Sequence, residues 1–120
     1  MAATINNEYG SIVISNNVIS NIAGAVANNC YGVVGMAVHN AKDGIVSLVK
    51  SGNLNKGISV SVENDALFLD IHIVVQYGVN INAICESIMH NVKYQVSVQT
   101  GFEVSCINVF VDSMRVAASE

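Results

Sequence analysis

Alternating apolar and polar residues predict a long strand and a shorter one in the middle of the chain. Over residues 66–77, every second residue from Leu67 to Tyr77 is apolar or aromatic. Residues 58–63 show the same period of two, and Asn64-Asp65 between the two segments suits a two-residue hairpin turn. We therefore expect the two segments to pair as an antiparallel hairpin.

Three further segments are rich in β-branched and apolar residues, which favours extended structure. They are residues 9–14, residues 32–38 and a last strand, in which Ile107, Val109 and Val111 point one way while Cys106, Asn108 and Phe110 point the other. Residues 1–7 are expected to be frayed. Residues 45–50 are expected to form a short helix that leads into a loop.

A period of 3.6 residues indicates two amphipathic helices. The first covers about residues 16–29, and Ser15 is well placed as its N-cap. The second follows Asn80, which is placed to cap it, and Gly101 is placed to close it in the left-handed conformation. Its apolar face is formed by Ile81, Ile84, Cys85, Ile88, Val92 and Val96.

Two amphipathic helices and these strands predict an α+β fold. We expect a single mixed sheet with both helices on one face, in the order β-α-(β)-β-β-α-β. One domain would cover residues 9–114, between a flexible N-terminus at residues 1–8 and a flexible C-terminus at residues 115–120. The other face of the sheet is left uncovered, and it is more apolar than a solvated face should be. The candidate interaction face is Phe68, His72, Val74 and Phe110, together with Val13.

The low charge of the chain limits which partners it can bind. Charged residues make up 12% of the 120 residues, the net charge is −4, and the five Lys and Arg residues are scattered. This argues against nucleic acid and against direct docking on an anionic membrane, which both need clustered positive charge. No apolar run approaches the roughly 18 residues of a membrane span, and the N-terminus does not resemble a signal peptide. We therefore expect a cytoplasmic protein.

Side chains that could carry chemistry are few. Cys30, Cys85 and Cys106 cannot all pair within one chain, so we interpret them as reduced thiols. Neither C-x-x-C nor H-x-x-x-H spacing occurs, which argues against a metal site built from the cysteines and His39, His72 and His90. Asp70 and His72 share one face of a strand, which favours a weak ion pair over a catalytic dyad. The sequence predicts no catalytic, cofactor-binding or metal-binding residue.

Two glycine-containing segments resemble parts of ligand-binding loops. The turn "YGVN", residues 77–80, joins a strand to a helix, but its one Gly and missing Lys favour a structural corner over a phosphate site. The segment "GVVG", residues 32–35, matches the loop of RNA-binding KH domains but lacks basic neighbours, which favours a structural reading. Gly32, Gly35, Gly78 and Gly101 are therefore interpreted as structural turn residues.

Three long segments together resemble the alkaline shock protein family of Gram-positive bacteria, also called YloU-like or envelope stress response proteins. They are "GSIVISNNVISNIAGAVANNCYGVVGM", "LFLDIHIVVQYGVNI" and "VSVQTGFEVSCINVFVDSM". The resemblance covers about residues 9–114. The chain departs from the family in having no Pro, in placing Asn16, Asn17 and Asn82 at the helix starts, and in its low charge, which puts any partner surface built on ion pairs in doubt.

The resemblance implies a small, non-enzymatic protein of the cytoplasm that is linked to envelope and alkaline stress. It implies self-association into a homo-oligomer, a scaffold role, and association with the membrane through a membrane-anchored protein partner. No cofactor, nucleic acid or direct membrane insertion is expected. An alternative hypothesis is a regulator that binds a small molecule or a protein in fatty-acid or lipid metabolism. A third, an RNA-binding module, would require retention on RNA that weakens steeply with salt.

Overall fold

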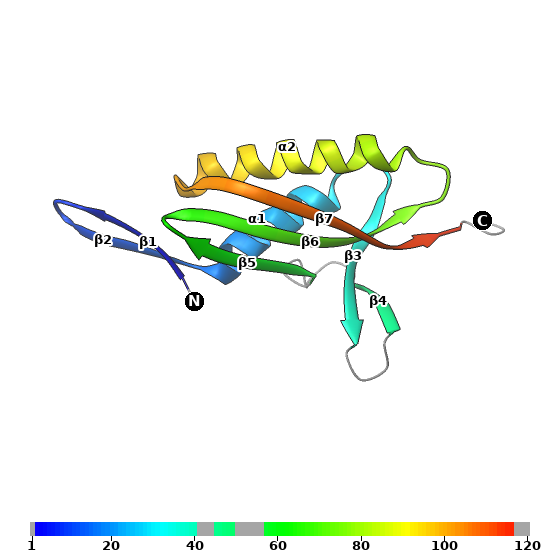
Figure 1. Ribbon diagram of the computed structural model, residues 1–120, viewed down its shortest axis with the longest axis horizontal. Coiled ribbons are helices and arrows are strands. Elements are labelled where there is room, and N and C mark those ends of the chain that lie inside the picture. The colour runs from blue at the N-terminus through cyan, green and yellow to red at the C-terminus, as the bar shows by residue number, and fades with distance from the viewer. Residues whose placement is uncertain (1, 41–44, 50–56, 117–120) are drawn as a thin grey trace.

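Two helices and seven strands make up the part of the chain that the structure describes. A computed structural model describes residues 2–40, 45–49 and 57–116 (Figure 1). The helices are α1 (Asn16–Asn28) and α2 (Ile81–Thr100). The strands are β1 (Ala2–Asn7), β2 (Gly10–Ser15), β3 (Val33–Asn40), β4 (Ile45–Val49), β5 (Ile58–Glu63), β6 (Ala66–Gln76) and β7 (Glu103–Arg115). The α+β class that the sequence predicts is confirmed.

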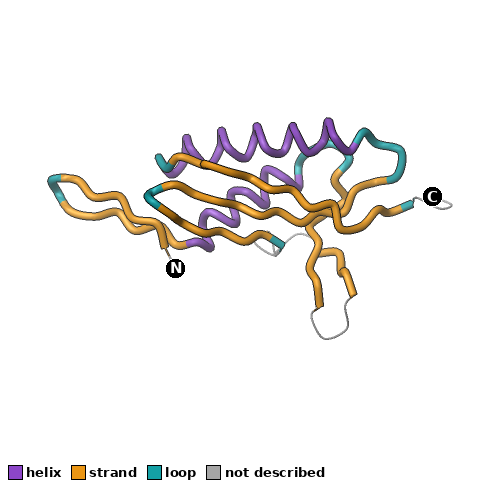
Figure 2. The backbone as a smooth tube through the Cα atoms, in the orientation of Figure 1, coloured by secondary structure: helices purple, strands orange, loops and turns teal. Residues whose placement is uncertain are grey.

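Strand β6 is the centre of the main sheet, because three other strands pair with it. Strand β7 runs parallel to β6 and pairs with it from Ala66 to Gln76. A strand has two edges, so β5 and β3 share the other one. There β5 pairs antiparallel with Ala66–Ile71 and β3 pairs antiparallel with Ile73–Val75. Strand β4 pairs with β3 and extends away from this centre, as Figure 2 shows.

Both helices start at the N-caps that the sequence predicts. The hydroxyl of Ser15 accepts a hydrogen bond from the backbone N–H of Val18 over 3.4 Å. The side-chain oxygen of Asn80 accepts one from the backbone N–H of Ala83 over 3.1 Å. Each bond satisfies a donor that the first helical turn cannot pair internally, which fixes where the helix begins.

The turns also follow the sequence. Asn64 and Asp65 have φ angles of 51° and 65°, the left-handed pair that a type I′ hairpin turn needs. Gly101 ends α2 in the left-handed region, with φ 82°. Gly32, before β3, has φ 89°, and a Cβ there would also meet the Cδ1 atom of Ile84 on α2. Glycine at this turn therefore lets the chain pass close beneath α2.

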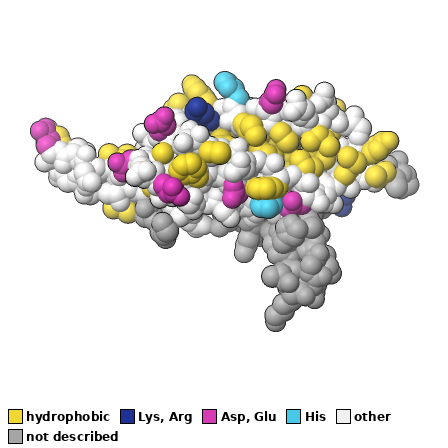
Figure 3. Space-filling view, viewed as in Figure 1, with side chains coloured by type: hydrophobic (Ala, Val, Ile, Leu, Met, Phe, Trp, Pro, Cys, Tyr) yellow, Lys and Arg dark blue, Asp and Glu magenta, His cyan; other side chains and the backbone are white. Residues whose placement is uncertain are grey.

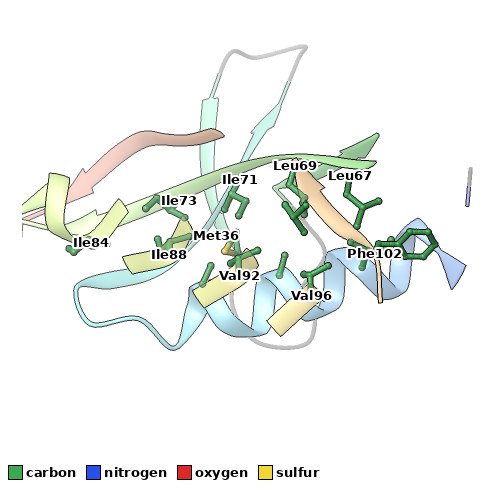
Figure 4. Packing of buried hydrophobic residues seen from close by; sticks show 14 of the residues in the cluster. Met36, Leu67, Leu69, Ile71, Ile73, Ile84, Ile88, Val92, Val96 and Phe102 are labelled. Carbon is green, nitrogen blue, oxygen red and sulfur yellow. The ribbon is translucent and has the colours of Figure 1, made fainter. Parts of the chain in front are cut away.

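The hydrophobic core lies between the two helices and one face of the main sheet. On β6 this face, the helix face, consists of Leu67, Leu69, Ile71 and Ile73, all fully buried. Figure 4 shows Ile71 and Ile73 pointing toward Ile88 and Val92 of α2. Helix α1 adds Ile19, Ala23 and Ala27 to the same core. Both helices therefore cover one face of the sheet, as the two amphipathic patterns predict.

The N-terminal region differs from the expectation. Residues 1–7 are predicted to be frayed, but Ala2–Asn7 form β1, which pairs antiparallel with β2 as a separate two-stranded sheet. Ala3 is fully buried in the core cluster and anchors the base of this hairpin, while its far end projects from the body (Figure 1). The expected single sheet is therefore two sheets, and β2, a strand expected in the main sheet, lies outside it.

Two assignments in the middle of the chain are also wrong. Residues 45–49 form strand β4, paired antiparallel with β3, where a short helix is expected. Five residues, four of them apolar, are too few to distinguish a helical period from a strand period, and the pairing with β3 makes this segment a strand. β3 extends to Asn40 and includes His39, two residues beyond the predicted strand at residues 32–38. At the C-terminus, Arg115, expected in a flexible tail, is the last residue of β7. The predicted loop at residues 50–56 lies outside the described residues.

Candidate functional site

The uncovered face of the main sheet is built by β6 and β7, with Ser59 and Ser61 of β5 beside Asp70 and Phe68. The parallel register of β6 and β7 places Phe68 beside Cys106, Asp70 beside Asn108, and His72 beside Phe110. Residues that are partners in a ladder point to the same face, so these six side chains share one surface. We call this surface, formed by Phe68, Asp70, His72, Cys106, Asn108 and Phe110, the open face.

His72 is the best-connected side chain of the open face. Its Nδ1 atom lies 2.7 Å from Oδ2 of Asp112, a hydrogen bond that becomes an ion pair when the imidazole is protonated. Its ring stacks on the ring of Phe110, with centroids 4.6 Å apart and planes 13° from parallel. The side chains of His72 and Asp112 are 29% and 13% exposed. The stack and the hydrogen bond together hold both rings in a fixed orientation on the sheet.

The expected pair of Asp70 with His72 is wrong. Oδ1 of Asp70 accepts a hydrogen bond from the amide of Asn108 over 3.0 Å, while His72 bonds to Asp112. Both polar side chains of β6 therefore bond sideways to β7 rather than along their own strand. The sequence places Asn108 on the same strand face as Phe110, but it predicts neither the bond of Asn108 to Asp70 nor that of Asp112 to His72, because the register of two parallel strands cannot be read from it.

Burial divides the residues proposed for the interaction face. Phe110 is 43% exposed, and Phe68 and His72 are half-buried. Val74, expected on this face, is only 6% exposed. It pairs with Gly35, where the β3–β6 register shifts, and nearby Ala37 is 1% exposed, so this end of the face is covered.

Val13 does not belong to the open face. It lies on β2 in the N-terminal hairpin, where it is 65% exposed. The main sheet and the hairpin are not paired with each other. Val13 is therefore an exposed side chain of the hairpin and not an extension of the open face.

The strand-to-helix corner at residues 77–80 closes the main sheet. Gly78 takes a φ angle of 93°, and the backbone N–H of Tyr77 donates to the carbonyl of Arg115 over 2.9 Å. That bond continues the β6–β7 ladder by one step, and Asn80 then caps α2. The Gly32–Gly35 segment is no loop between helices, because Gly35 lies within β3.

The other side chains considered for metal binding or catalysis do not cluster in the described residues. Across residues 2–40, 45–49 and 57–116, no three His, Cys, Asp or Glu side chains are grouped to hold a metal ion. His90 is an exposed residue of α2. Cys30, Cys85 and Cys106 are free thiols, and burial raises the pKa of the Cys85 thiol. Within the described part of the chain, the open face is where the predicted site residues meet.

A groove of about 540 Å³ lies on the other side of the molecule, between the helices. It is lined by Ala25, Val26, Asn29, Cys30, Tyr31, Ser87, Asn91 and Gln95. Its polar lining consists of neutral side chains, so it offers hydrogen bonds but no charge. The sequence does not predict this groove, because it depends on how the two helices cross.

No helix in the described residues is long and apolar enough to cross a membrane. Among solved structures, the chain resembles MamM CTD in its copper form, with 13% identity, a TM-score of 0.48 and coverage of 86% of this chain and 90% of that one.

Sequence comparison gives nearer relatives. The chain is 37% identical over 117 residues to YloU of Bacillus subtilis (strain 168), covering 97% of this chain and 98% of the relative. It is 34% identical to Spy1614 of Streptococcus pyogenes serotype M6 over 97% of both chains. Residues 4–116 match the model of the alkaline shock protein 23 family, which is the alkaline shock protein family and is described by a cell envelope-related function. The chain therefore belongs to the alkaline shock protein family that its sequence resembles.

Proposed function

We propose that this chain is a non-enzymatic scaffold protein of the envelope stress response. It would act in the cytoplasm by self-association and by binding a protein partner that is anchored in the membrane. Family membership supports the link to the cell envelope. The scaffold mechanism is supported by the open face.

The single observation that carries the proposal is Phe110 on the open face. Phe110 is 43% exposed, and its ring is held in place by the stack on His72. A rigid, partly exposed aromatic ring with a polar neighbour is the kind of anchor that protein interfaces bury, because little conformational entropy is lost when it is covered. His72, Asp70 and Asn108 bond to neighbours within the sheet, so they can be covered with those hydrogen bonds already made.

The test is a Phe110→Asp substitution, read by light scattering coupled to size exclusion over a range of protein concentrations. Fully burying a Phe side chain contributes roughly 1.5–3 kcal/mol, so covering the exposed part of Phe110 contributes about 1 kcal/mol, and we expect association to weaken about fivefold. Val98→Asp is the matched control, because Val98 is 62% exposed on α2, away from the open face. Far-UV circular dichroism checks that both variants remain folded.

Three results would count against the proposal. A wild-type chain that stays monomeric at high concentration would remove self-association. A Phe110→Asp variant that associates like the wild type would remove the open face as the contact surface. If Val98→Asp weakens association as strongly, the contact lies on α2 instead.

A further inference from the structure

The outer edge of β7 offers an unused row of backbone hydrogen-bonding groups. β7 has 13 residues, and within the described residues it pairs with β6 alone. Its central part, Ile107–Val111, contains neither Pro nor a charged residue, the features that commonly block pairing at sheet edges. Figure 3 shows a band of hydrophobic side chains over the region between α2 and β7. This edge is therefore suited to receive another strand.

The register with β6 shows which β7 residues face the helices. They are Val104, Ile107, Val109, Val111 and Met114, the partners of Leu67, Leu69, Ile71, Ile73 and Val75. The steps between them are three, two, two and three residues, because the register shifts once near each end of β7. This pattern is symmetric about Val109. An antiparallel copy of β7 centred on Val109 would therefore match helix-facing residues with helix-facing residues along its whole length.

We propose that two copies of this chain associate by antiparallel pairing of β7 with β7, around a two-fold axis at Val109. Ile107 would lie opposite Val111 of the second copy, and Asn108 opposite Phe110 of the second copy. Glu103 would lie opposite Arg115 of the second copy, and the two-fold axis gives two such Glu–Arg pairs in each dimer. The inference rests on the self-association of the proposed function and deepens it: the copies would join at the edge of β7, with Phe110 at the seam on the open face.

Other registers do not fit the pattern. A shift by an odd number of residues between the two strands sets helix-facing residues against open-face residues, because side chains alternate with a period of two. Centring on Asn108 sets Val104 opposite Asp112, and centring on Phe110 sets Ile107 opposite Ser113. Neither of these registers brings Glu103 to Arg115. The register centred on Val109 is therefore favoured twice: it matches helix-facing residues with each other, and it brings Glu103 to Arg115 of the second copy.

The pairing of β7 with β7 also constrains the distance between the two copies of α2. α2 packs over β7, so the two copies of α2 would lie side by side across the axis. Packed helices need about 8–10 Å between their axes, while neighbouring strands are about 4.8 Å apart. The joined sheet must therefore bend at the seam so that the helices splay. The register shifts on both sides of Ile107–Val111 supply such bending, because bulges increase local twist.

A charge-reversal cycle tests the register. Glu103 and Arg115 are both exposed, and twelve residue steps of about 3.3 Å put them roughly 40 Å apart within one strand, too far to attract each other. Glu103→Arg and Arg115→Glu should each weaken dimerisation about tenfold, because two attractions become two repulsions. The double variant restores opposite charges and should return to within about threefold of the wild type. Sedimentation equilibrium measures the dissociation constants of the three variants and of the wild type.

Disulfide trapping tests the axis independently. In a Cys106→Ser background, Val109→Cys faces its own copy, and antiparallel partners about 4.5–5.5 Å apart at Cα fall within disulfide range. Mild oxidation should therefore give a covalent dimer. Val111→Cys is the matched control, because Val111 is half-buried on the same face but lies about 13 Å from its own copy in this register. It should remain a monomer on a non-reducing gel.

The outcomes separate this interface from self-association in general. A wild type that associates, with charge variants that bind as tightly as the wild type and no Val109→Cys dimer, would overturn the β7 pairing and leave the proposed function standing. Equal trapping at Val109→Cys and Val111→Cys would overturn the register. A monomeric wild type would overturn self-association and this interface together.

Discussion

The two faces of β6 differ in what they contribute, although they belong to the same eleven residues. The helix face presents Leu67, Leu69 and Ile71 to α1 and α2, and each is fully buried. The open face presents Phe68, Asp70 and His72, which are half-buried and make their contacts sideways with β7. Stability therefore depends mainly on one face, which leaves the other available for interaction.

The difference has a simple physical cause. Two amphipathic helices supply enough apolar surface to cover one face of a narrow sheet, and no third layer exists among the described residues. The side chains on the open face are therefore exposed to solvent while no partner is bound. The polar residues of the open face are hydrogen-bonded, and His72 stacks on Phe110, so these side chains are stable in contact with water. The ring of Phe110 nevertheless stays accessible to a partner.

The largest expected effect comes from the helix face. Ile71→Ala should lower the free energy of unfolding by about 2–5 kcal/mol, because it leaves a cavity beneath α2. Phe68→Ala removes more atoms from the same strand but should cost only about 1 kcal/mol, because that ring is already partly exposed to water. Urea unfolding followed by circular dichroism measures both. Equal losses would show that the open face is covered within the monomer.

A smaller effect is expected from the polar pair of the open face. His72→Ala removes the 2.7 Å hydrogen bond to Asp112 and the stack on Phe110, and should cost about 1 kcal/mol in the free energy of unfolding. Asp112→Asn keeps the shape and one hydrogen-bonding group, so it should cost less. The same urea titration applies. A His72→Ala loss as large as that of Ile71→Ala would place His72 among the core residues.

Local patterns in the sequence predicted most of the elements and the division into two faces. The alternation from Leu67 to Tyr77, the N-caps at Ser15 and Asn80, and the turn at Asn64-Asp65 depend on neighbours a few residues away. Such interactions can be read from the sequence because the partners are adjacent in the chain. The position of both helices on one sheet face followed from their apolar stripes.

Long-range pairings could not be read in the same way. Asp112 meets His72 across forty residues of sequence, and only the register of β6 with β7, shifted near Val74, brings them together. β1 becomes a strand because β2 pairs with it and Ala3 is buried, not because of its own pattern. β4 depends likewise on β3. In each case, the deciding partner lies outside the local sequence window.

The smallest expected effect concerns Cys85, a half-buried residue of α2. Burial raises the pKa of its thiol, because the thiolate loses solvation in the folded chain. The folded state therefore keeps the proton at a pH where the unfolded state releases it, and stability falls as pH rises above the ordinary thiol pKa.

Urea unfolding at about pH 7 and about pH 9.5 should show a smaller loss of stability for Cys85→Ser than for the wild type. Cys106→Ser is the matched substitution at an exposed thiol of the open face. A Cys85→Ser variant with an unchanged pH dependence would show that the Cys85 thiol ionises alike in the folded and unfolded states and is not desolvated on α2.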